Sequence, residues 1–576
     1  MKKETVAQIL DEIGVLLELK GENPFKTRAY HNAARVIKGL SEDLTDLVAS
    51  GEIRKIKGIG SALADKITEL VNTGHLKYYE DLRASFPESL LQLLRIPSLG
   101  PKKIKKLYDE LNIQSIEQLE AACEQHQLAG LEGFGARTEE KILEGIQFIK
   151  EHRDRHLFHI AFAAAQQLYE AVESHPTVIR ASIAGSLRRC KETVKDIDIV
   201  SSARDEDRQA IMEFYTHLPG VQSIIAQGET KSSIITAEGI QADLRVVSDD
   251  EFPYALHHFT GSREHNTAMR AFARKQGLKM NEYGLFRDDD SRIECKTEEA
   301  IFAALGMEFI PPEIREDMGE IEAALAGQLP HLIEKKDIRG IIHAHTTYSD
   351  GANTIEEMAR ACKDMGLEYL GLADHSQSVY YANGLSVERL QEQRKRIDEL
   401  NQQLKGFRIF QGTECDILSD GSLDYPDEAL QELDFVIISV HQKLNMTEKE
   451  ATERIVKAMA HPAVTILGHP TGRLLLSREG YPLNYAEIFA AAVEYNVIIE
   501  INASPYRFDL DWRYARDAKE KGVMLSINPD AHSIDGLKDT YLGVGIARKG
   551  WLTAADVLNT RSQKEVSEIF SRKKSA

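Results

Sequence analysis

The sequence predicts a multidomain protein of mixed α+β and α/β class, with a helical N-terminal part, a mixed central part and a C-terminal barrel. Three observations support this prediction. Residues 1–150 show helical periodicity around short glycine-containing hairpins. Residues 196–200 alternate acidic and apolar side chains, as a half-buried strand does. From Ile338, seven short apolar strands alternate with helical segments, which predicts parallel strands in a distorted (β/α)7 barrel.

Composition limits the classes of protein that fit this chain. The 576 residues are enough for several domains, and no apolar run reaches membrane-spanning length. Residues 1–12 carry charged side chains and no secretory signal pattern. The five cysteines are scattered without a CxxC pair, as is typical of reduced thiols, so we expect a cytoplasmic protein. The net charge of −20 argues against a simple nucleic-acid coat but allows local basic surfaces.

Residues 185–200 place two carboxylates beside a potential anion site. Asp196 and Asp198 are two positions apart on the predicted strand, so their carboxylates share one face. They raise each other's pKa unless a cation lies between them, and Mg²⁺ prefers such oxygen ligands. Gly185-Ser186 can begin a helix whose amides face an anion, and Arg188-Arg189 add positive charge. The stretch therefore predicts a metal platform beside a triphosphate cradle.

A third carboxylate follows on another predicted strand, 240–247. Asp243 lies there among apolar residues, where a carboxylate is costly unless it is paired or bound to a metal. We expect Asp243 to complete the platform. The alternative is an ion pair with Arg245.

A glycine hairpin pattern recurs three times in the N-terminal part, at 56–64, 96–101 and 131–135. The first and third copies keep two glycines, and the second has Ser98 in place of the first glycine. Lysines and arginines flank two of the copies. Such helix-hairpin-helix elements bind the DNA backbone without reading sequence, although a single copy would equally suit an ordinary connector. The glycines expected to contact DNA are Gly58, Gly60, Gly100, Gly133 and Gly135.

Side chains of metal-ligand type follow strand after strand in the C-terminal part. Chemistry in parallel barrels lies at the C-terminal ends of the strands. The mixed set suits Zn²⁺, Mn²⁺ or Fe²⁺ better than Mg²⁺ alone and is large enough for two or three metals. Arg473 follows the fifth strand and can hold a phosphate. The candidate ligands are His343, His345, Asp350, His375, Glu414, His441, His469, Asp530 and His532.

Together these motifs resemble the bacterial and archaeal family X DNA polymerases that carry a C-terminal polymerase-and-histidinol-phosphatase (PHP) domain. The resemblance covers nearly the whole chain. It implies a DNA-directed DNA polymerase that fills short gaps during base excision repair, with a metal-dependent 3′–5′ exonuclease in the PHP domain. It also implies Mg²⁺ at the polymerase site and two to three Mn²⁺ or Zn²⁺ ions at the PHP site. The expected partners are gapped or primer–template DNA and deoxynucleoside triphosphates, bound by a monomer.

The resemblance also implies roles for single residues. Asp196, Asp198 and Asp243 would bind the two catalytic metals. The segment 258–262 would press against the sugar and bias the site against a 2′-hydroxyl, although family members often carry Tyr-Phe where this chain has His258-Phe259. Arg270 would contact the template. The implied nucleotide-binding residues are Ser186, Arg189, His258, Phe259, Gly261 and Asn266, with Asn266 at the minor-groove edge of the base pair and Ser186 and Arg189 on the triphosphate.

The N-terminal domain resembles the 5′-phosphate-binding and lyase domain of the same family. Lys66 matches the position of the Schiff-base lysine, and Lys26 matches a lysine that contacts phosphate. A further basic position of the family is Ala62 here. The resemblance therefore implies a possible 5′-deoxyribose-phosphate lyase, whose Schiff base also requires a lysine of lowered pKa.

We expect six parts along the chain, and three other functions stay open. The parts are residues 1–85, a helical DNA-binding domain of the lyase type; 86–150, a second helical hairpin subdomain; 151–250, the nucleotidyltransferase palm; 251–316, the nucleotide-selecting subdomain; 317–335, a linker; and 336–576, the PHP domain.

The first alternative function is that of an untemplated nucleotidyltransferase. The second is a DNA-binding scaffold with a PHP phosphatase for small molecules. In the third, the PHP domain is purely structural.

Overall fold

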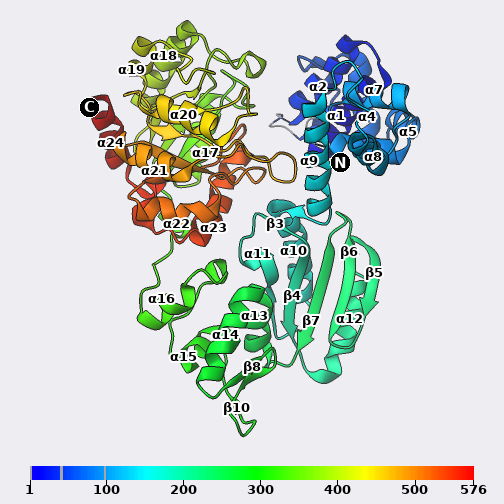
Figure 1. The fold of residues 1–576 in the computed structure, drawn as a ribbon, viewed down its shortest axis with the longest axis vertical. Helices are drawn as coiled ribbons and strands as arrows, with labels where there is room; N and C mark the ends of the chain where they lie inside the picture. Colours follow the sequence, from blue (N-terminus) through cyan, green and yellow to red (C-terminus); the bar gives the residue numbers. More distant parts are fainter. Residues whose placement is uncertain (1–2, 39, 41–42, 97–98, 576) are drawn as a thin grey trace. The chain divides into compact units, whose positions relative to one another are not determined.

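The computed structural model describes residues 3–38, 40, 43–96 and 99–575 of the chain. Contacts between residues divide it into two compact units (Figure 1). The first contains residues 1–153 and the short segments 350–355 and 476–478, and the second contains the rest. No helix within the described ranges is long and apolar enough to cross a membrane.

The N-terminal unit is built from helices over two hydrophobic cores. Leu10, Ile13 and Ile67 are central to the first core, and Leu107 and Leu119 to the second. The helical periodicity predicted from residue 5 onward is confirmed. The helices are α1 (Lys3–Lys20), α2 (Pro24–Lys38), α3 (Leu44–Ala49), α4 (Ser61–Thr73), α5 (Lys77–Ala84), α6 (Glu88–Gln92), α7 (Pro101–Leu111), α8 (Ile116–Glu124) and α9 (Ala136–His152).

The predicted glycine hairpins lie directly before helices. Gly58 and Gly133 have φ values of 96° and 85°, a left-handed conformation that glycine adopts without steric cost. Gly60, Gly100 and Gly135 each precede the first residue of a helix, and no side chain caps the amides that follow them. These amides can therefore face a phosphate. Pro97 and Ser98 of the second hairpin lie outside the described residues.

The central part begins with a five-stranded sheet in the order β2-β4-β7-β6-β5. β4 and β7 are parallel neighbours, whereas the other pairs in this sheet are antiparallel. A short β1–β3 pair lies apart from it. The elements are β1 (His156–Leu157), α10 (Phe158–Glu173), β2 (Arg180–Ile183), α11 (Gly185–Arg188), β3 (Thr193–Val194), β4 (Asp196–Ser202), α12 (Arg208–Thr216), β5 (Val221–Gln227), β6 (Lys231–Thr236) and β7 (Gln241–Val247).

Residues 252–326 add helices around a small antiparallel sheet in the order β10-β9-β8. Met269, Phe302 and Ile310 are buried in its core. The elements are α13 (Phe252–Thr260), α14 (Arg263–Lys275), β8 (Lys279–Asn281), β9 (Gly284–Phe286), β10 (Arg292–Ile293), α15 (Glu298–Ala304) and α16 (Glu320–Ala326). The stretch 317–335, predicted to be a linker, contains the short helix α16.

The C-terminal part is a parallel barrel that contains all seven predicted strands. Two sheets, β11-β12-β13 and β14-β15-β16-β17-β18, are joined by parallel bridges at His375–Glu414 and Ala344–Ala531. The strands are β11 (Gly340–Ala344), β12 (Tyr369–Leu372), β13 (Arg408–Gln411), β14 (Glu414–Asp416), β15 (Ile437–Ser439), β16 (Ile466–Leu467), β17 (Ile498–Asn502) and β18 (Leu525–Asn528). The helices are α17 (Ile355–Asp364), α18 (Val387–Gln403), α19 (Asp427–Glu432), α20 (Glu448–Met459), α21 (Tyr485–Glu494), α22 (Trp512–Glu520), α23 (Thr540–Lys549) and α24 (Gln563–Ser575).

The sequence prediction missed β14, because the third strand is interrupted at Gly412. A Cβ atom there would lie 2.5 Å from the ring of Phe435, so the backbone passes too close for any larger residue. The break separates β13 from Glu414 and turns that side chain into the barrel. The barrel core below, with Tyr369, Phe410 and Phe570, is apolar.

Candidate active sites

Glu414 is the centre of a buried cluster at the C-terminal ends of the barrel strands. Its Oε1 lies 2.8 Å from Nε2 of His469 and 3.1 Å from Nε2 of His441. Its Oε2 lies 3.0 Å from Nδ1 of His375 and 3.5 Å from Nε2 of His343. Nε2 of His345 lies 3.7 Å from Oε2, so this one carboxylate faces five imidazoles.

Asp530 provides a second carboxylate in the same cluster. Its Oδ1 lies 3.1 Å from Nε2 of His345 and 3.6 Å from Nε2 of His343. The φ values of His343 and Asp530 are 67° and 54°, a left-handed conformation that non-glycine residues rarely adopt and that gathers at functional sites. Three groups have ligand atoms within 4.8 Å of one another: His343, His345, Glu414 and Asp530; His375, Glu414 and His441; and His345, Asp350, His375 and His532.

Glu500, at the middle of β17, orients this cluster and was missed by the sequence reasoning. Its side chain is fully buried and accepts hydrogen bonds from Nδ1 of His343 (2.6 Å) and from the amide of His469 (3.0 Å). Burial lowers the pKa of His343, but Glu500, Asp530 and Glu414 outweigh burial and hold that pKa well above its ordinary value. Because Nδ1 is held by Glu500, Nε2 of His343 points toward Glu414.

The cluster fits divalent metal ions. Nε2 of His343 and Oε2 of Glu414 are buried, and although imidazole nitrogens lie close to this oxygen, neither atom has a partner with hydrogen-bond geometry among the described residues. Buried polar atoms are rarely left so, unless an ion or water completes them. Mixed imidazole and carboxylate donors are the ligand set of Zn²⁺, Mn²⁺ and Fe²⁺. Burial acts to raise the pKa of Glu414, yet the neighbouring histidines keep it well below its ordinary value, so the carboxylate is ionised and able to bind a cation.

The structure argues against the predicted phosphate-binding role of Arg473. Its guanidinium donates to the carbonyls of Arg507 and Phe508 and to Asp511, so all three nitrogens are used within the protein. Arg507 is the better-placed cation. Its Nε lies 3.7 Å from Oδ2 of Asp530, and its buried Nη1 lacks a hydrogen-bond partner in the described part of the chain.

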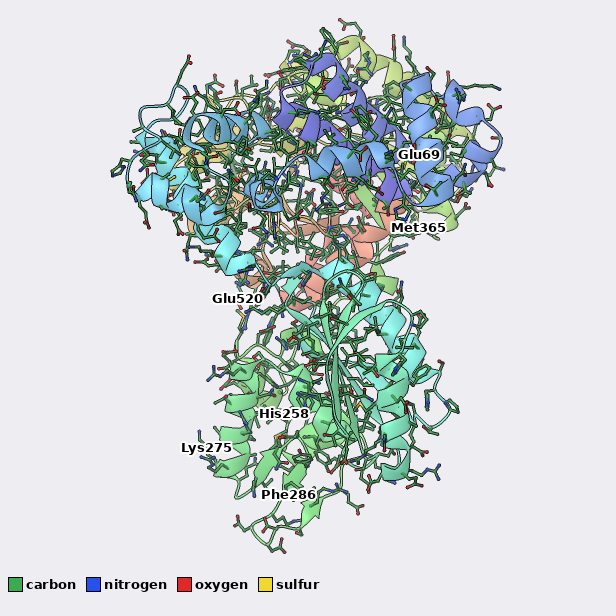
Figure 2. All side chains as sticks on the ribbon, turned by 90° about the vertical axis from the view of Figure 1, so that its right-hand side faces the viewer. Glu69, His258, Lys275, Phe286, Met365 and Glu520 are labelled. Carbon is green, nitrogen blue, oxygen red and sulfur yellow. The ribbon has the colours of Figure 1, made fainter. Side chains whose placement is uncertain are left out.

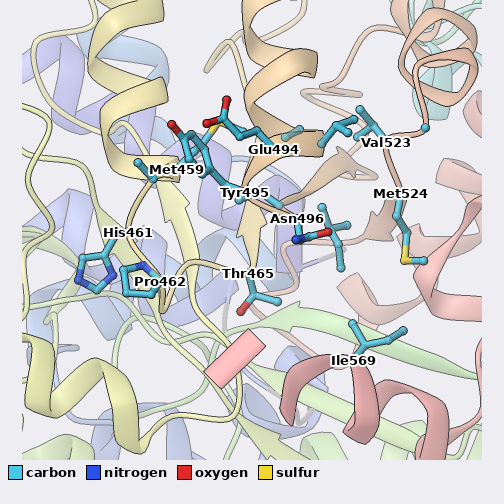
Figure 3. A pocket seen from close by; sticks show the side chains of 16 residues that line it. Met459, His461, Pro462, Thr465, Glu494, Tyr495, Asn496, Val523, Met524 and Ile569 are labelled. Carbon is cyan, nitrogen blue, oxygen red and sulfur yellow. The ribbon is translucent and has the colours of Figure 1, made fainter. Parts of the chain in front are cut away.

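A separate pocket lies at the opposite, N-terminal ends of the barrel strands (Figure 3). Thr465, Val497 and Met524 line it just before β16, β17 and β18. Chemistry in parallel barrels lies at the other end of the strands. This pocket, whose titratable side chains are His461, Glu494 and Tyr495, therefore carries no part of the site.

The predicted carboxylates of the central sheet lie on adjacent strands. Asp198 on β4 lies directly opposite Asp243 on β7, and Asp196 shares a strand face with Asp198. Burial and the nearby Asp243 raise the pKa of Asp196. Burial, Asp196 and Asp243 raise the pKa of Asp198 to about 7. Repulsion of this kind marks a place where a cation would be strongly favoured.

Asp243 pairs with Lys231 rather than with Arg245. Nζ of Lys231 lies 2.6 Å from Oδ2 of Asp243. Burial acts to raise the pKa of Asp243, but hydrogen bonds from Lys231 and neighbouring polar groups lower it overall. Arg245 instead lies over the ring of Phe259, 4.1 Å from its centroid. In the described residues, the groups of three or more ligand atoms within 4.8 Å are all in the barrel, so the three carboxylates of the central sheet are spread more widely.

Gly185 lets α11, the predicted triphosphate cradle, approach these carboxylates closely. It begins α11 with a φ of 63°, and a Cβ atom there would lie 2.3 Å from Oδ2 of Asp198. Any other residue would displace the carboxylate or the helix. The close contact explains why glycine stands at the start of the stretch.

Four family profiles match the chain. They are a helix-hairpin-helix domain (residues 1–76), a SAM-like helix-hairpin-helix tandem (90–147), the DNA polymerase beta thumb (255–316) and the PHP domain (342–504). The chain is 41% identical over 577 residues to the DNA polymerase/3′-5′ exonuclease PolX of Bacillus subtilis (strain 168), covering 99% of this chain and 100% of that protein. The chain belongs to the PolX family. It is also 29% identical over 249 residues to a probable phosphatase of Thermoanaerobacter sp. (strain X514), covering 40% of this chain and 94% of that protein.

Membership of the PolX family confirms the predicted resemblance and fold class. The predicted nucleotide-selecting residues lie together around the turn between α13 and α14. Nδ2 of Asn266 donates to the carbonyls of His258 (2.7 Å) and Gly261 (3.2 Å), and Nε of Arg270 donates to the carbonyl of Asn266. A Cβ atom on Gly261 would lie 2.5 Å from Oδ1 of Asn266. His258, Asn266 and Arg270 line a small cavity (His258 is labelled in Figure 2), and their roles in PolX catalysis stay predictions.

The two arginines of the PolX cradle contact the same turn. Nη1 of Arg188 donates to Oγ1 of Thr260, and Nη1 of Arg189 donates to its carbonyl at 2.6 Å. Nε of Arg189 is 3.0 Å from Oε1 of Glu316. Arg188 also pairs with Glu298. The cradle and the nucleotide-selecting turn are therefore joined, while the binding of a triphosphate by Ser186 and Arg189 remains a prediction.

The two lysines predicted for the lyase site both lie near the ring of Tyr78. Nζ of Lys66 lies 4.9 Å and Nζ of Lys26 lies 5.9 Å from the ring centroid of Tyr78. Nζ of Lys66 also donates to the carbonyl of Ala62, one turn earlier on α4. Tyr30 stacks on Tyr78 with a centroid distance of 6.3 Å. The structure brings the two lysines together, and their chemistry stays a prediction.

Proposed function

We propose that the protein is a template-directed DNA polymerase that fills short gaps in DNA repair and removes 3′ nucleotides with its PHP domain. The register that sets Asp198 opposite Asp243, beside the Gly185 cradle, is the observation that supports polymerisation most strongly. The family and the helix-hairpin-helix elements support DNA as the substrate.

For polymerisation, we assign Asp196, Asp198 and Asp243 as ligands of two Mg²⁺ ions. When bound, such ions lower the pKa of the primer 3′-hydroxyl and neutralise the leaving pyrophosphate. The chain's own groups then position the nucleotide. The amides after Gly185 and the guanidinium of Arg189 face the triphosphate, and Gly261 and Asn266 shape the sugar and base-pair side of the site.

For degradation, we assign the nine barrel residues as ligands of two or three Mn²⁺ or Zn²⁺ ions. When bound, such ions supply a hydroxide nucleophile and neutralise the phosphodiester. Glu500 holds His343 in one tautomer and orientation, and Glu414 faces several imidazoles at once. Arg507 lies beside Asp530, where it can meet a phosphate oxygen of the DNA.

DNA would be bound through its backbone by the N-terminal unit. The uncapped amides after Gly60, Gly100 and Gly135 suit phosphate contacts. Lys26 is assigned to the 5′-phosphate of the gap and Lys66 to a possible lyase reaction, on the basis of their shared position at Tyr78. We further propose that the chain acts as a monomer, with the six-part division given above.

The test uses a gapped duplex with a labelled primer and a 5′-phosphate. Asp198→Ala should abolish extension and keep degradation, and His343→Ala should do the reverse, with Mg²⁺ or Mn²⁺ supplied in turn. Extension that ignores the template would support an untemplated transferase. Phosphate release from small monoesters, with no effect of Asp198→Ala on DNA, would support the scaffold carrying a phosphatase. Degradation that survives His343→Ala would make the PHP domain structural.

A further inference from the structure

The loop between α11 and β3, shortly before the strand that carries Asp196 and Asp198, is held by helices of the C-terminal barrel. Residues 189–192 lie between α11 and β3. Nζ of Lys549, at the end of α23, donates to the carbonyl of Arg189 at 3.0 Å. Nε1 of Trp512 donates to Oε2 of Glu192. The contact is tight, because a Cβ atom on Gly545 of α23 would lie 2.9 Å from Sγ of Cys190.

Lys549 is buried and uses its donors fully. Its exposed fraction is 1%, and an ammonium has three donors. Three acceptors surround it: the carbonyl of Arg189, the carbonyl of Glu313 at 3.1 Å and Oε1 of Glu316. Nζ also lies 4.5 Å from the ring centroid of Trp512. Such a site selects an ammonium rather than any other group of similar size.

Glu316 links this lysine to the nucleotide site. Its carboxylate is shared by Lys549, by Nε of Arg189 at 3.0 Å and by Nζ of Lys191 at 3.5 Å. Burial acts to raise the pKa of Glu316, but Lys549 and Arg189 outweigh it and lower the pKa overall. Burial lowers the pKa of Lys549 to about 8, a shift that Glu316 opposes, so the ammonium stays charged at neutral pH. The three cations Lys549, Arg189 and Lys191 and the single anion Glu316 together carry a charge of +2. Without Lys549 this group carries +1.

We propose that Lys549 of the PHP domain is a positioning residue of the polymerase nucleotide site. It neutralises Glu316 and fixes the Arg189 carbonyl, so that the charge and direction of the Arg189 guanidinium are set for the triphosphate. Without Lys549, Glu316 keeps Arg189 and Lys191 as its partners and lowers the positive potential at the cradle. The inference deepens the proposed function, since it rests on Arg189 meeting the incoming nucleotide.

The experiment compares Lys549→Met with the wild type in the full-length chain. We measure the Kd of a deoxynucleoside triphosphate with Ca²⁺ and primer–template, and separately KM and kcat for extension with Mg²⁺. Kd and KM should each rise about tenfold, the effect of one weakened charge-assisted hydrogen bond, while kcat and exonuclease activity change less than about twofold. Lys519→Met, on α22 and paired with Asp556, is the matched control and should leave Kd unchanged.

A double variant separates positioning from simple tethering. If Lys549 acts through Glu316, adding Glu316→Gln to Lys549→Met should return Kd and KM toward the wild-type values. An unchanged Kd in Lys549→Met, or a double variant as weak as the single one, would overturn the inference. So would a parallel loss of exonuclease activity, which would indicate a tether. If the wild type binds the triphosphate but does not extend, the proposed function fails while the Kd comparison still decides the inference.

Discussion

Glu192 allows a quantitative test of how the loop 189–192 is attached to the barrel. Its side chain is 10% exposed and accepts hydrogen bonds from Nε1 of Trp512 (3.0 Å) and Nη2 of Arg513 (2.9 Å). Burial acts to raise the pKa of Glu192, but Arg513 and Arg473 outweigh it and lower the pKa from 4.5 to about 2. The carboxylate is therefore bound more favourably in the folded chain than in the unfolded one.

The sign of the pH dependence follows from this direction. A carboxyl group whose pKa falls on folding stabilises the folded state fully above its unfolded pKa. That contribution is lost as the pH falls from about 5 toward 2. The shift from 4.5 to about 2 corresponds to about 3 kcal/mol, at ~1.4 kcal/mol per pKa unit. We expect Glu192→Gln to lower the free energy of unfolding by about that amount at pH 7, and by about half of it at pH 3.

The assay is urea unfolding followed by tryptophan fluorescence between pH 7 and pH 3. The chain has two tryptophans, Trp512 and Trp551, and the first contacts Glu192 directly. Glu238→Gln, in an exposed turn between β6 and β7, is the matched control and should follow the wild type. A difference between wild type and Glu192→Gln that stays constant with pH would refute the reasoning, because it would show that the charge of Glu192 does not stabilise the fold.

Four further outcomes follow. Asp198→Asn should abolish primer extension without slowing degradation, and retained extension in a gel assay would contradict the palm assignment. Glu500→Gln should lower metal affinity or exonuclease rate by about 10–100-fold, checked by metal titration, since it releases His343. A chelator should lower the melting temperature of the full chain measured by calorimetry, and an unchanged value would argue against a metal-filled barrel. Phe570→Ala should cost about 3–5 kcal/mol in chemical unfolding, because its ring is 97% buried against Phe410 and Phe435.

Local patterns predicted the parts of this molecule that depend on neighbours in sequence. The period of two in β4 places Asp196 and Asp198 on one face, and the order of the parallel strands brings the barrel ligands to one end. The hairpin glycines precede their helices for a similarly local reason. These features depend on spacing, which a sequence displays directly.

Residues that act through distant partners left no such pattern. In the sequence, Glu500 is a single acidic residue in an apolar strand and belongs to no motif. Only its contact with His343, 157 positions away, indicates its function. Lys231 carries no motif, yet it pairs with Asp243. Arg473 comes shortly after the predicted metal ligand His469, as expected for a phosphate-binding residue. Its guanidinium instead donates to Asp511. Tertiary pairing decides each of these cases, and it is not encoded in local periodicity.

Charged side chains connect residues 189–192 and Glu316 of the central part with the barrel. Removing one partner of a buried ion pair is costly, as expected for Glu192, but replacing the whole pair by apolar side chains changes stability little, because the cost of removing two charges from water offsets their attraction. Apolar side chains could therefore hold the two parts together equally well, but would permit them to slide. Glu192 and Glu316 each accept directional bonds from the barrel side, from Trp512 and Lys549 respectively. Such bonds fix one position of the loop 189–192, so the charged contacts constrain the geometry of this loop in a way that apolar packing would not.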